Sequence, residues 1–258
     1  MKCTLPLALT FLTVCPWFRF GEVTPGDLAR SLIWFPWVGA MLGLVYWGAG
    51  AGLAGLFPTP AAAALLLWLT VLLTRGLHLD GLADTVDGLG GGRTPEACLA
   101  IMKDSRLGAF GAVALVLVLL LKFSFLMALL DQGKEQSLVL FPLVSRWGQV
   151  LLAVLAPYAR PGGGLGQAMT EGATPRRVVG ATLAALLLSL LAAGLPGLVS
   201  LVLAGLVAWG LSRYFRRRLG GITGDVLGAL NEILETVVLG VAVLWGSWPG
   251  SLHFPGLF

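Results

Sequence analysis

Long apolar stretches with almost no charge run through most of the chain, and they limit it to one kind of fold. A helix crosses the hydrocarbon core of a bilayer with roughly 20 mostly apolar residues. Of the 258 residues, 57% are hydrophobic and 12% are charged, whereas a soluble domain carries about a quarter charged residues. So few charged side chains cannot cover a globule of this size with solvated groups. Soluble, disordered and nucleic-acid-coating proteins are therefore excluded, and we predict an all-α, polytopic helical membrane protein.

The apolar stretches predict about seven transmembrane helices, with six to eight as the range, in a single membrane domain over residues 1–258. The apolar run within 1–30 is too short to span a bilayer, so we expect an interfacial or re-entrant helix there. Residues 80–107 are expected to form a cytoplasmic catalytic loop. Residues 213–235 begin with a basic loop and continue into a second acidic motif. The predicted spans are 32–56, 61–79, 108–130, 138–156, 178–195, 197–212 and 226–248.

The basic residues predict a cytoplasmic N-terminus and an external C-terminus. With seven spans in this orientation, 14 of the 17 Lys and Arg residues fall in cytoplasmic segments, Lys134 falls in an outer loop, and two lie within spans. Cytoplasmic loops of membrane proteins carry such an excess of Lys and Arg. In this topology both acidic motifs lie at the cytoplasmic ends of their helices, where they could face each other across one cavity.

The first acidic motif consists of Asp80, Asp84 and Asp87, which are four and three residues apart. On an α-helix these positions lie within a stripe about 60° wide. Like charges at this spacing destabilise a helix, so a compensating cation is expected. Mg²⁺ is suited to this role because it binds carboxylate and phosphate oxygens. The alternative is a solvated acidic face where the chain leaves the membrane.

The second acidic motif consists of Asp225, Glu232 and Glu235. The two glutamates lie about two and three turns into an otherwise apolar span. An acidic side chain at bilayer depth costs about 2.5–3.5 kcal/mol, which marks it as part of a functional site by default. Asp225 alone has a simpler explanation as a helix N-cap. We therefore predict that the second motif joins the first in binding metal.

Basic residues near these carboxylates would suit a phosphate-bearing substrate. Lys103 and Arg106 precede the third long span, although they could equally be topology anchors. Arg146 lies inside a span, where an arginine needs a partner. His78 is a candidate base or phosphate donor, with a structural role as the alternative. Lys122 is predicted to be incidental, with its ammonium reaching the membrane surface along its aliphatic stem.

At these residues the chain resembles the cobalamin synthase family, the adenosylcobinamide-GDP ribazoletransferases. The longest and most unusual matching string is HLDGLADTVDG at 78–88, and the matches run in order along nearly the whole chain. The family usually has Arg-Leu-Pro after Phe-Leu-Thr, where this chain has Val14, Cys15 and Pro16, so no role for an arginine there is implied. The other matching stretches are 101–108 and 220–229, with shorter ones at 11–13, 35–39, 158–160 and 164–166.

The resemblance implies a Mg²⁺-dependent transferase that joins adenosylcobinamide-GDP to α-ribazole or its 5′-phosphate. The products would be adenosylcobalamin or its phosphate, and GMP, in the last step of nucleotide-loop assembly in vitamin B12 biosynthesis. The enzyme would be a multi-pass protein of a bacterial or archaeal cytoplasmic (inner) membrane, with its active site facing the cytoplasm. Its partners would be these substrates and membrane lipid, without nucleic acid; self-association as a homo-oligomer is left open.

For this reaction the candidate residues fall into three groups. The candidates for catalysis are Asp84, as acceptor of the hydroxyl proton, and His78. The candidate metal ligands are the two acidic motifs, Asp80, Asp84, Asp87, Asp225, Glu232 and Glu235. The candidate substrate-binding residues are Lys103, Asp104, Ser105, Arg106, Arg146 and Arg160.

Two other classes of membrane protein remain as alternatives. A CDP-alcohol phosphotransferase-like enzyme would also bind metal with acidic side chains at a cytoplasmic surface, but its DGxxAR pattern is absent, because Asp84 follows Ala83 here. A cation-coupled transporter would also bury acidic residues, but such sites lie near the midplane between inverted repeats. The predicted topology places both acidic motifs near one face of the membrane, which favours an enzyme over a transporter.

We predict that a single cysteine placed at position 93 of a variant lacking the three native cysteines will be labelled from the cytoplasmic side of sealed vesicles. Cysteines placed in 157–177 and in 213–225 should be labelled from that side too, because positively charged loops stay in the cytoplasm. Labelling of position 93 from the external side alone would contradict a cavity shared by the two acidic motifs.

Overall fold

The computed structural model describes residues 4–15, 23–160 and 165–247. Within these ranges the chain is helical, and its one β-type pairing is an isolated bridge between Tyr158 and Ile222. The predicted all-α class is confirmed. The elements are α1 (Thr4–Leu12), α2 (Pro25–Ser31), η1 (Leu32–Trp34), α3 (Phe35–Leu56), α4 (Thr59–Thr74), α5 (Leu77–Gly91), α6 (Pro95–Ile101), α7 (Ala109–Asp131), η2 (Glu135–Val139), α8 (Leu140–Leu155), α9 (Leu165–Gly172), α10 (Pro175–Ala193), α11 (Leu195–Leu219) and α12 (Gly224–Ser247).

Prolines and glycines set many of these boundaries. Proline is tolerated in the first turn of a helix, where its missing N–H has no partner in any case, and glycine adopts the left-handed conformation that ends helices. Prolines occupy the first turn of α2, α3, α4, α6, α10 and α11. Gly220, with φ of 78°, ends α11.

Six helical segments among the described residues are long and apolar enough to cross a membrane, or seven if the bent pair α4 and α5 counts as one span. This agrees with the predicted number. α1 has 9 residues, too few to span; the rest of the predicted N-terminal interfacial segment lies partly outside the described residues. The segment 197–212 was predicted as a short span, and it belongs to α11, which has 25 residues.

Two predicted boundaries are wrong. The second span was predicted to run to residue 79, but α4 ends at Thr74 and the chain turns by 87° into α5. Arg75 and Gly76, with φ of 55° and 63°, make this turn. The loop predicted to begin at Arg213 is also wrong, because α11 remains helical to Leu219. Its three arginines 216–218 lie in the last turn, where cations interact favourably with the helix dipole.

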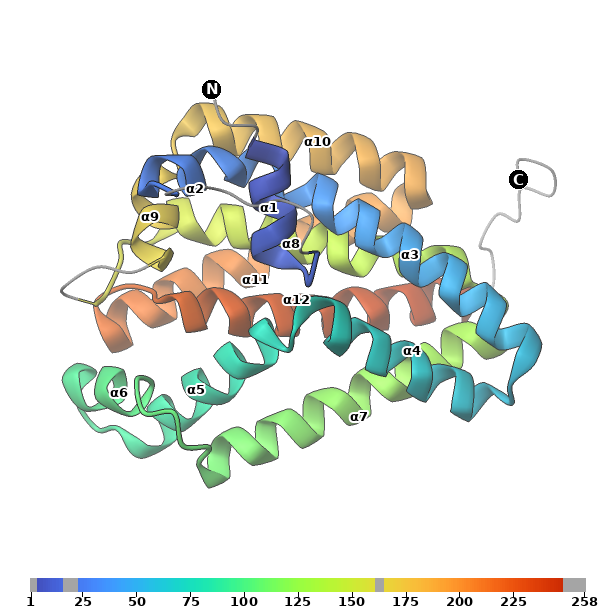
Figure 1. Ribbon diagram of the computed structural model, residues 1–258, viewed down its shortest axis with the longest axis horizontal. Helices are drawn as coiled ribbons and strands as arrows, with labels where there is room; N and C mark the ends of the chain where they lie inside the picture. Colours follow the sequence, from blue (N-terminus) through green and yellow to red (C-terminus); the bar gives the residue numbers. More distant parts are fainter. Residues whose placement is uncertain (1–3, 16–22, 161–164, 248–258) are drawn as a thin grey trace.

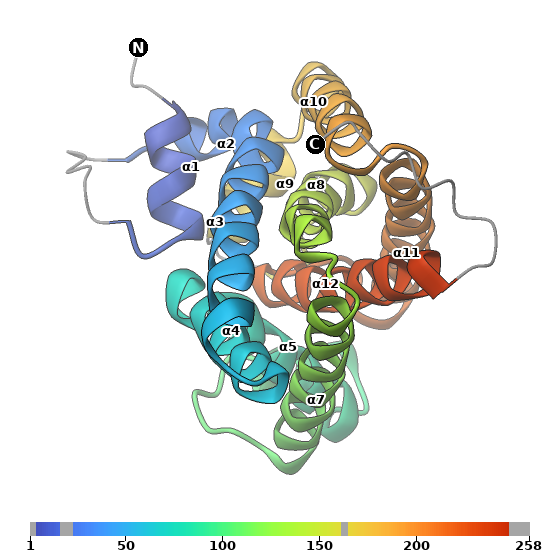
Figure 2. The same ribbon diagram turned by 90° about the vertical axis from the view of Figure 1, so that its right-hand side faces the viewer.

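Helix α12 runs through the middle of the bundle, as Figure 1 shows, and packs against α5, α7, α8 and α11. In the end view of Figure 2, α4, α5 and α7 form one side of the bundle, and α10 and α11 the other, with α8 and α12 between them. Helices α5 and α12 carry the two acidic motifs, so their contact determines how the motifs lie relative to each other.

Glycine lets α5 and α12 approach closely. A Cβ added at Gly81 of α5 would lie 2.8 Å from the carbonyl oxygen of Asp225, and one added at Gly228 of α12 would lie 3.3 Å from the Cα of Gly81. Small residues permit such backbone contact between membrane helices. Asp225 is therefore held directly beside Asp80 and Gly81, although 145 positions separate Asp80 from Asp225 in the sequence.

We predict that Gly81→Ala lowers the free energy of unfolding by about 1–3 kcal/mol, the usual cost of overpacking. Gly52→Ala is the matched control, because nothing lies within 4 Å of a Cβ added at this exposed helical glycine. The control should be more stable than the wild type by about 0.5–1 kcal/mol, the helix preference of alanine over glycine. Thermal unfolding in detergent measures both. Equal stabilisation of the two variants would contradict the close contact of α5 with α12.

Candidate active site

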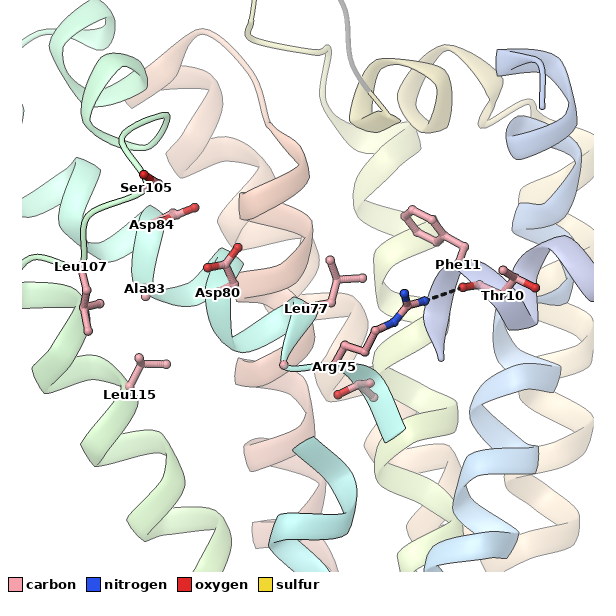
Figure 3. Close-up of a pocket in the computed structure, with 12 residues that line it drawn as sticks. Thr10, Phe11, Arg75, Leu77, Asp80, Ala83, Asp84, Ser105, Leu107 and Leu115 are labelled. Atoms are coloured by element: carbon pink, nitrogen blue, oxygen red, sulfur yellow. Dashed lines mark hydrogen bonds between the residues drawn. The ribbon is translucent and has the colours of Figure 1, made fainter. Parts of the chain in front are cut away.

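A cavity of about 690 Å³ lies where α1, the turn between α4 and α5, and the start of α7 meet. Figure 3 shows Asp80 and Asp84 between Arg75 with Thr10 at one end of the cavity and Ser105 with Leu107 at the other. The cavity thus combines apolar walls with a few polar groups, which is typical of small-molecule sites. Its lining residues are Thr10, Phe11, Thr74, Arg75, Gly76, Leu77, Asp80, Ala83, Asp84, Ser105, Leu107 and Leu115.

Asp80 and Asp84 are the acidic side chains of this cavity. They lie one helical turn apart on α5, with Asp80 exposed and Asp84 half-buried. Within the described parts of the chain, neither carboxylate has a hydrogen bond or an ion pair. The predicted acidic stripe is therefore helical, and two of its three members face one cavity without a partner.

Asp225 lies beside this pair but already has a cation. Its carboxylate accepts a hydrogen bond from Nη2 of Arg160 at 2.6 Å and one from the Thr223 hydroxyl at 3.3 Å. Two backbone bonds hold Arg160 in place, because the N–H of Ala159 donates to the Ile222 carbonyl and the N–H of Ile222 donates to Pro157. The predicted substrate residue Arg160 and the predicted ligand Asp225 thus form one ion pair.

Asp87 caps the start of α7. One carboxylate oxygen accepts the N–H of Gly108 and the other accepts the N–H of Gly111, each at 2.8 Å. Acidic side chains stabilise a helix at this position because the first N–H groups have no partner within the helix. A Cβ at either glycine would collide with the Asp87 carboxylate. The structure thus gives Asp87 a structural contact that Asp80 and Asp84 lack.

Glu232 and Glu235 lie in a buried network of charges. Nζ of Lys122 on α7 lies 2.5 Å from Glu232 and 2.6 Å from Glu235, and Arg146 on α8 pairs with Glu235. Asn231 also donates to Glu235 at 3.0 Å. The prediction that Lys122 is incidental and reaches the membrane surface is wrong, because its side chain is 6% exposed and paired with both glutamates. The structure therefore gives these glutamates cationic partners away from Asp80 and Asp84.

Two further predicted site residues, His78 and Arg146, do not line this cavity. His78 is buried where α5 meets α12, and its Nδ1 has no hydrogen-bond partner in the described structure. Arg146 is fully buried in the charge network. Its place inside a span predicted that it needs a partner, and that partner is Glu235.

The loop between α6 and α7 supplies two residues to the cavity, Ser105 and Leu107. Asp104 and Arg106, on either side of Ser105, form an ion pair at 2.6 Å, and Lys103 is exposed. Hydrogen bonds from Arg106 lower the pKa of Asp104 to about 2. Asp104 thus remains ionised at neutral pH and holds Arg106.

No three acidic, histidine or cysteine side chains in the described ranges lie close enough together to hold one metal ion. The donor set at the cavity nonetheless suits Mg²⁺, which keeps several waters and commonly binds proteins through one or two carboxylates together with substrate phosphates. Asp80 and Asp84 provide two such carboxylates with free oxygens. A soft metal would require sulfur or imidazole ligands, which this cavity lacks among its described lining residues.

The roles of two residues, Lys122 and Arg75, were not predicted from the sequence. Lys122 could have been found by counting charges within the spans, where two cations, Lys122 and Arg146, match two glutamates. Arg75 lines the cavity and donates to the carbonyls of Thr10 and Thr13. Its signal was its place directly before Gly76, at the helix break.

Comparison with known proteins gives a consistent result. A family model described as Cobalamin-5-phosphate synthase matches residues 4–243. An adenosylcobinamide-GDP ribazoletransferase from Syntrophobacter fumaroxidans is 44% identical over 237 residues, which cover 91% of this chain and 96% of that protein. The enzyme of the same description from Pseudomonas putida W619 is 48% identical over 241 residues, covering 92% and 97%. No solved structure matches the chain.

We predict that Lys122→Met destabilises the protein by about 3–5 kcal/mol, because it leaves two buried carboxylates with one cation. The double variant Lys122→Met/Glu232→Gln restores the charge balance and should recover much of that loss. Thermal unfolding in detergent, measured for the wild type and both variants, tests the prediction. A double variant that is less stable than the single one would show that charge balance does not control stability here.

Proposed function

Because the chain belongs to the cobalamin-5-phosphate synthase family and is an adenosylcobinamide-GDP ribazoletransferase, we propose that it joins its two substrates in the cavity at Asp80 and Asp84. The membership agrees with the resemblance found in the sequence and replaces the two alternative classes. The observation that carries the proposal is the pair of carboxylates that have no partner among the described residues and line the cavity of about 690 Å³.

In this proposal Asp80 and Asp84 are the residues that would hold Mg²⁺, and Asp225 lies close by as a charged neighbour paired with Arg160. Bound there, Mg²⁺ would offset negative charge on the phosphate oxygens. Asp87, Glu232 and Glu235 are left out of the metal site, because their partners are the start of α7, Lys122 and Arg146.

The reaction requires a hydroxyl group of α-ribazole, or of its 5′-phosphate, to attack the phosphorus that bears the cobinamide arm. The new P–O bond forms as the phosphoanhydride bond breaks, and GMP leaves with the bonding electron pair. We assign Asp84 as the acceptor of the hydroxyl proton, since it is half-buried, unpaired and one turn from Asp80. The apolar residues Leu77, Leu107 and Leu115 line the same cavity beside these groups.

The cavity is proposed to open to the cytoplasm. The segments 75–108 and 157–160, at and near the cavity, carry five of the 14 basic residues that stay inside in the predicted topology: Arg75, Arg93, Lys103, Arg106 and Arg160. The curated relatives are bacterial proteins, which suits a multi-pass protein of the inner membrane. Incubation of the purified protein with adenosylcobinamide-GDP, α-ribazole and Mg²⁺ should release GMP, and omission of Mg²⁺ should abolish that release.

We predict that Asp80→Asn lowers the rate of GMP release by a hundredfold or more at low Mg²⁺. The amide keeps the size of the side chain but removes the charge that binds the cation. Each 1.36 kcal/mol of lost transition-state stabilisation is a tenfold slower reaction, and a metal supplies several kcal/mol. Higher Mg²⁺ should recover part of the rate, as a titration from micromolar to tens of millimolar would show.

Asp87→Asn is the control within the same acidic stripe. It should lower the melting temperature, because it weakens the cap of α7, while the Mg²⁺ concentration for half-maximal rate stays at the wild-type value. An Asp80→Asn rate within about threefold of wild type at low Mg²⁺ would move the metal site to Asp84 and Asp87. A raised Mg²⁺ requirement in Asp87→Asn would contradict the assignment of Asp87 as a cap alone.

A further inference from the structure

Arg75 sits at the rim of the cavity in an unusual backbone conformation. It is the one residue other than glycine with positive φ in the described ranges, at 55°. A side chain in the left-handed region is disfavoured by contact between Cβ and the backbone, and such residues gather at functional sites. The next residue, Gly76, has φ of 63°. A glycine adopts this conformation without the steric cost that an arginine has. The position of Arg75 therefore calls for an explanation beyond the turn itself.

The guanidinium of Arg75 is held in place through one of its nitrogens. Nη2 donates to the carbonyl of Thr10 at 3.0 Å and to the carbonyl of Thr13 at 2.8 Å. These carbonyls lie at the C-terminal end of α1, where backbone oxygens have no helical partner and favour a cation. Figure 3 shows the side chain reaching from the turn to α1 along the edge of the cavity. Among the described residues, Nε and Nη1 of Arg75 have no hydrogen-bond partner.

Charge in the cavity also points to Arg75. It is the one basic side chain among the described lining residues, which include the unpaired carboxylates of Asp80 and Asp84. Arg75 does not neutralise these carboxylates, since its bonds go to carbonyl groups instead. A fixed cation in the same cavity as an acidic pair that could hold a metal ion suits the binding of an anionic group such as a phosphate.

We propose that Arg75 binds a phosphate oxygen of the pyrophosphate of adenosylcobinamide-GDP. In this proposal the C-terminal end of α1 keeps the Arg75 guanidinium in position. The proposal rests on the proposed function of the cavity. Arginine is suited to this role because its planar donors bind phosphate oxygens in fixed directions. The alternative is a structural clamp, in which Arg75 only fastens α1 to the turn between α4 and α5.

The test compares Arg75→Gln with Arg213→Gln. Glutamine can still donate to a carbonyl of α1 but carries no charge. Arg213 is a matched control, because it is an exposed arginine on α11 that stacks on Trp209, away from the cavity lining. Two readouts are needed: equilibrium binding of adenosylcobinamide-GDP with Mg²⁺ but without α-ribazole, and the KM of each substrate from GMP release.

Arg75→Gln should weaken equilibrium binding of adenosylcobinamide-GDP about tenfold or more, the usual effect of losing a charge-assisted hydrogen bond. Its KM for that substrate should rise likewise, while its KM for α-ribazole stays within about twofold of wild type. Arg213→Gln should match the wild type in both measurements. Unchanged binding in Arg75→Gln, or equal increases in both KM values with a lower melting temperature, would overturn the proposal in favour of a clamp.

Arg75→Lys covers the case in which the glutamine variant does not fold. Lysine keeps the charge but not the planar donors, so binding of adenosylcobinamide-GDP should fall less than tenfold and should weaken further as salt concentration rises. Wild-type affinity in Arg75→Lys at all salt concentrations would contradict a directed phosphate contact. If the wild type and Arg213→Gln themselves released no GMP, the proposed function would fail, independently of Arg75.

Discussion

Charged side chains inside a bilayer have no water to solvate them, and the packing of α7, α8 and α12 follows from this constraint. Lys122 on α7 and Arg146 on α8 are both paired with glutamates of α12. Separating these helices would leave buried charges without partners, which costs several kcal/mol. The pairs therefore fix the position of α12 along its neighbours, and with it the position of Asp225 at the start of α12. A charge network at bilayer depth thus determines geometry at the end of the bundle.

Helix α5 is attached to this framework by different means. It leaves the line of α4 at the turn made by Arg75 and Gly76, and it packs against α12 where Gly81 removes a side chain from the contact. At its other end the carboxylate of Asp87 caps α7. The first contact is made by the backbone of α5 and the second by the Asp87 side chain, and neither involves Asp80 or Asp84. Of the three carboxylates of the acidic stripe, Asp87 is thus used to hold α5, whereas Asp80 and Asp84 stay available.

The sequence was sufficient to predict the fold class, the approximate number of spans and the helical stripe of Asp80, Asp84 and Asp87, because hydropathy and helical spacing are local properties. It could not predict which partner each carboxylate would find. Glu235 pairs with Lys122 although 113 positions separate them, and Asp87 bonds to Gly108 across 21 positions. Such contacts depend on how the helices pack. The end of α4 was missed for a related reason, since the apolar pattern continues through a turn that only backbone conformation reveals.

The acidic side chains at the two motifs differ chiefly in their partners: some are paired with a cation or with backbone N–H groups, and others are not. At the depth of Glu235 an unpaired carboxylate would be costly, so each glutamate there has a cation. Asp80 and Asp84 can remain unpaired because their cavity is open to water, as the exposure of Asp80 indicates. A pyrophosphate entering that cavity would displace water and add negative charge beside two carboxylates. In the proposed reaction the substrate and a divalent cation must therefore bind together, since neither the carboxylates nor the pyrophosphate can lose water without the charge that the cation supplies.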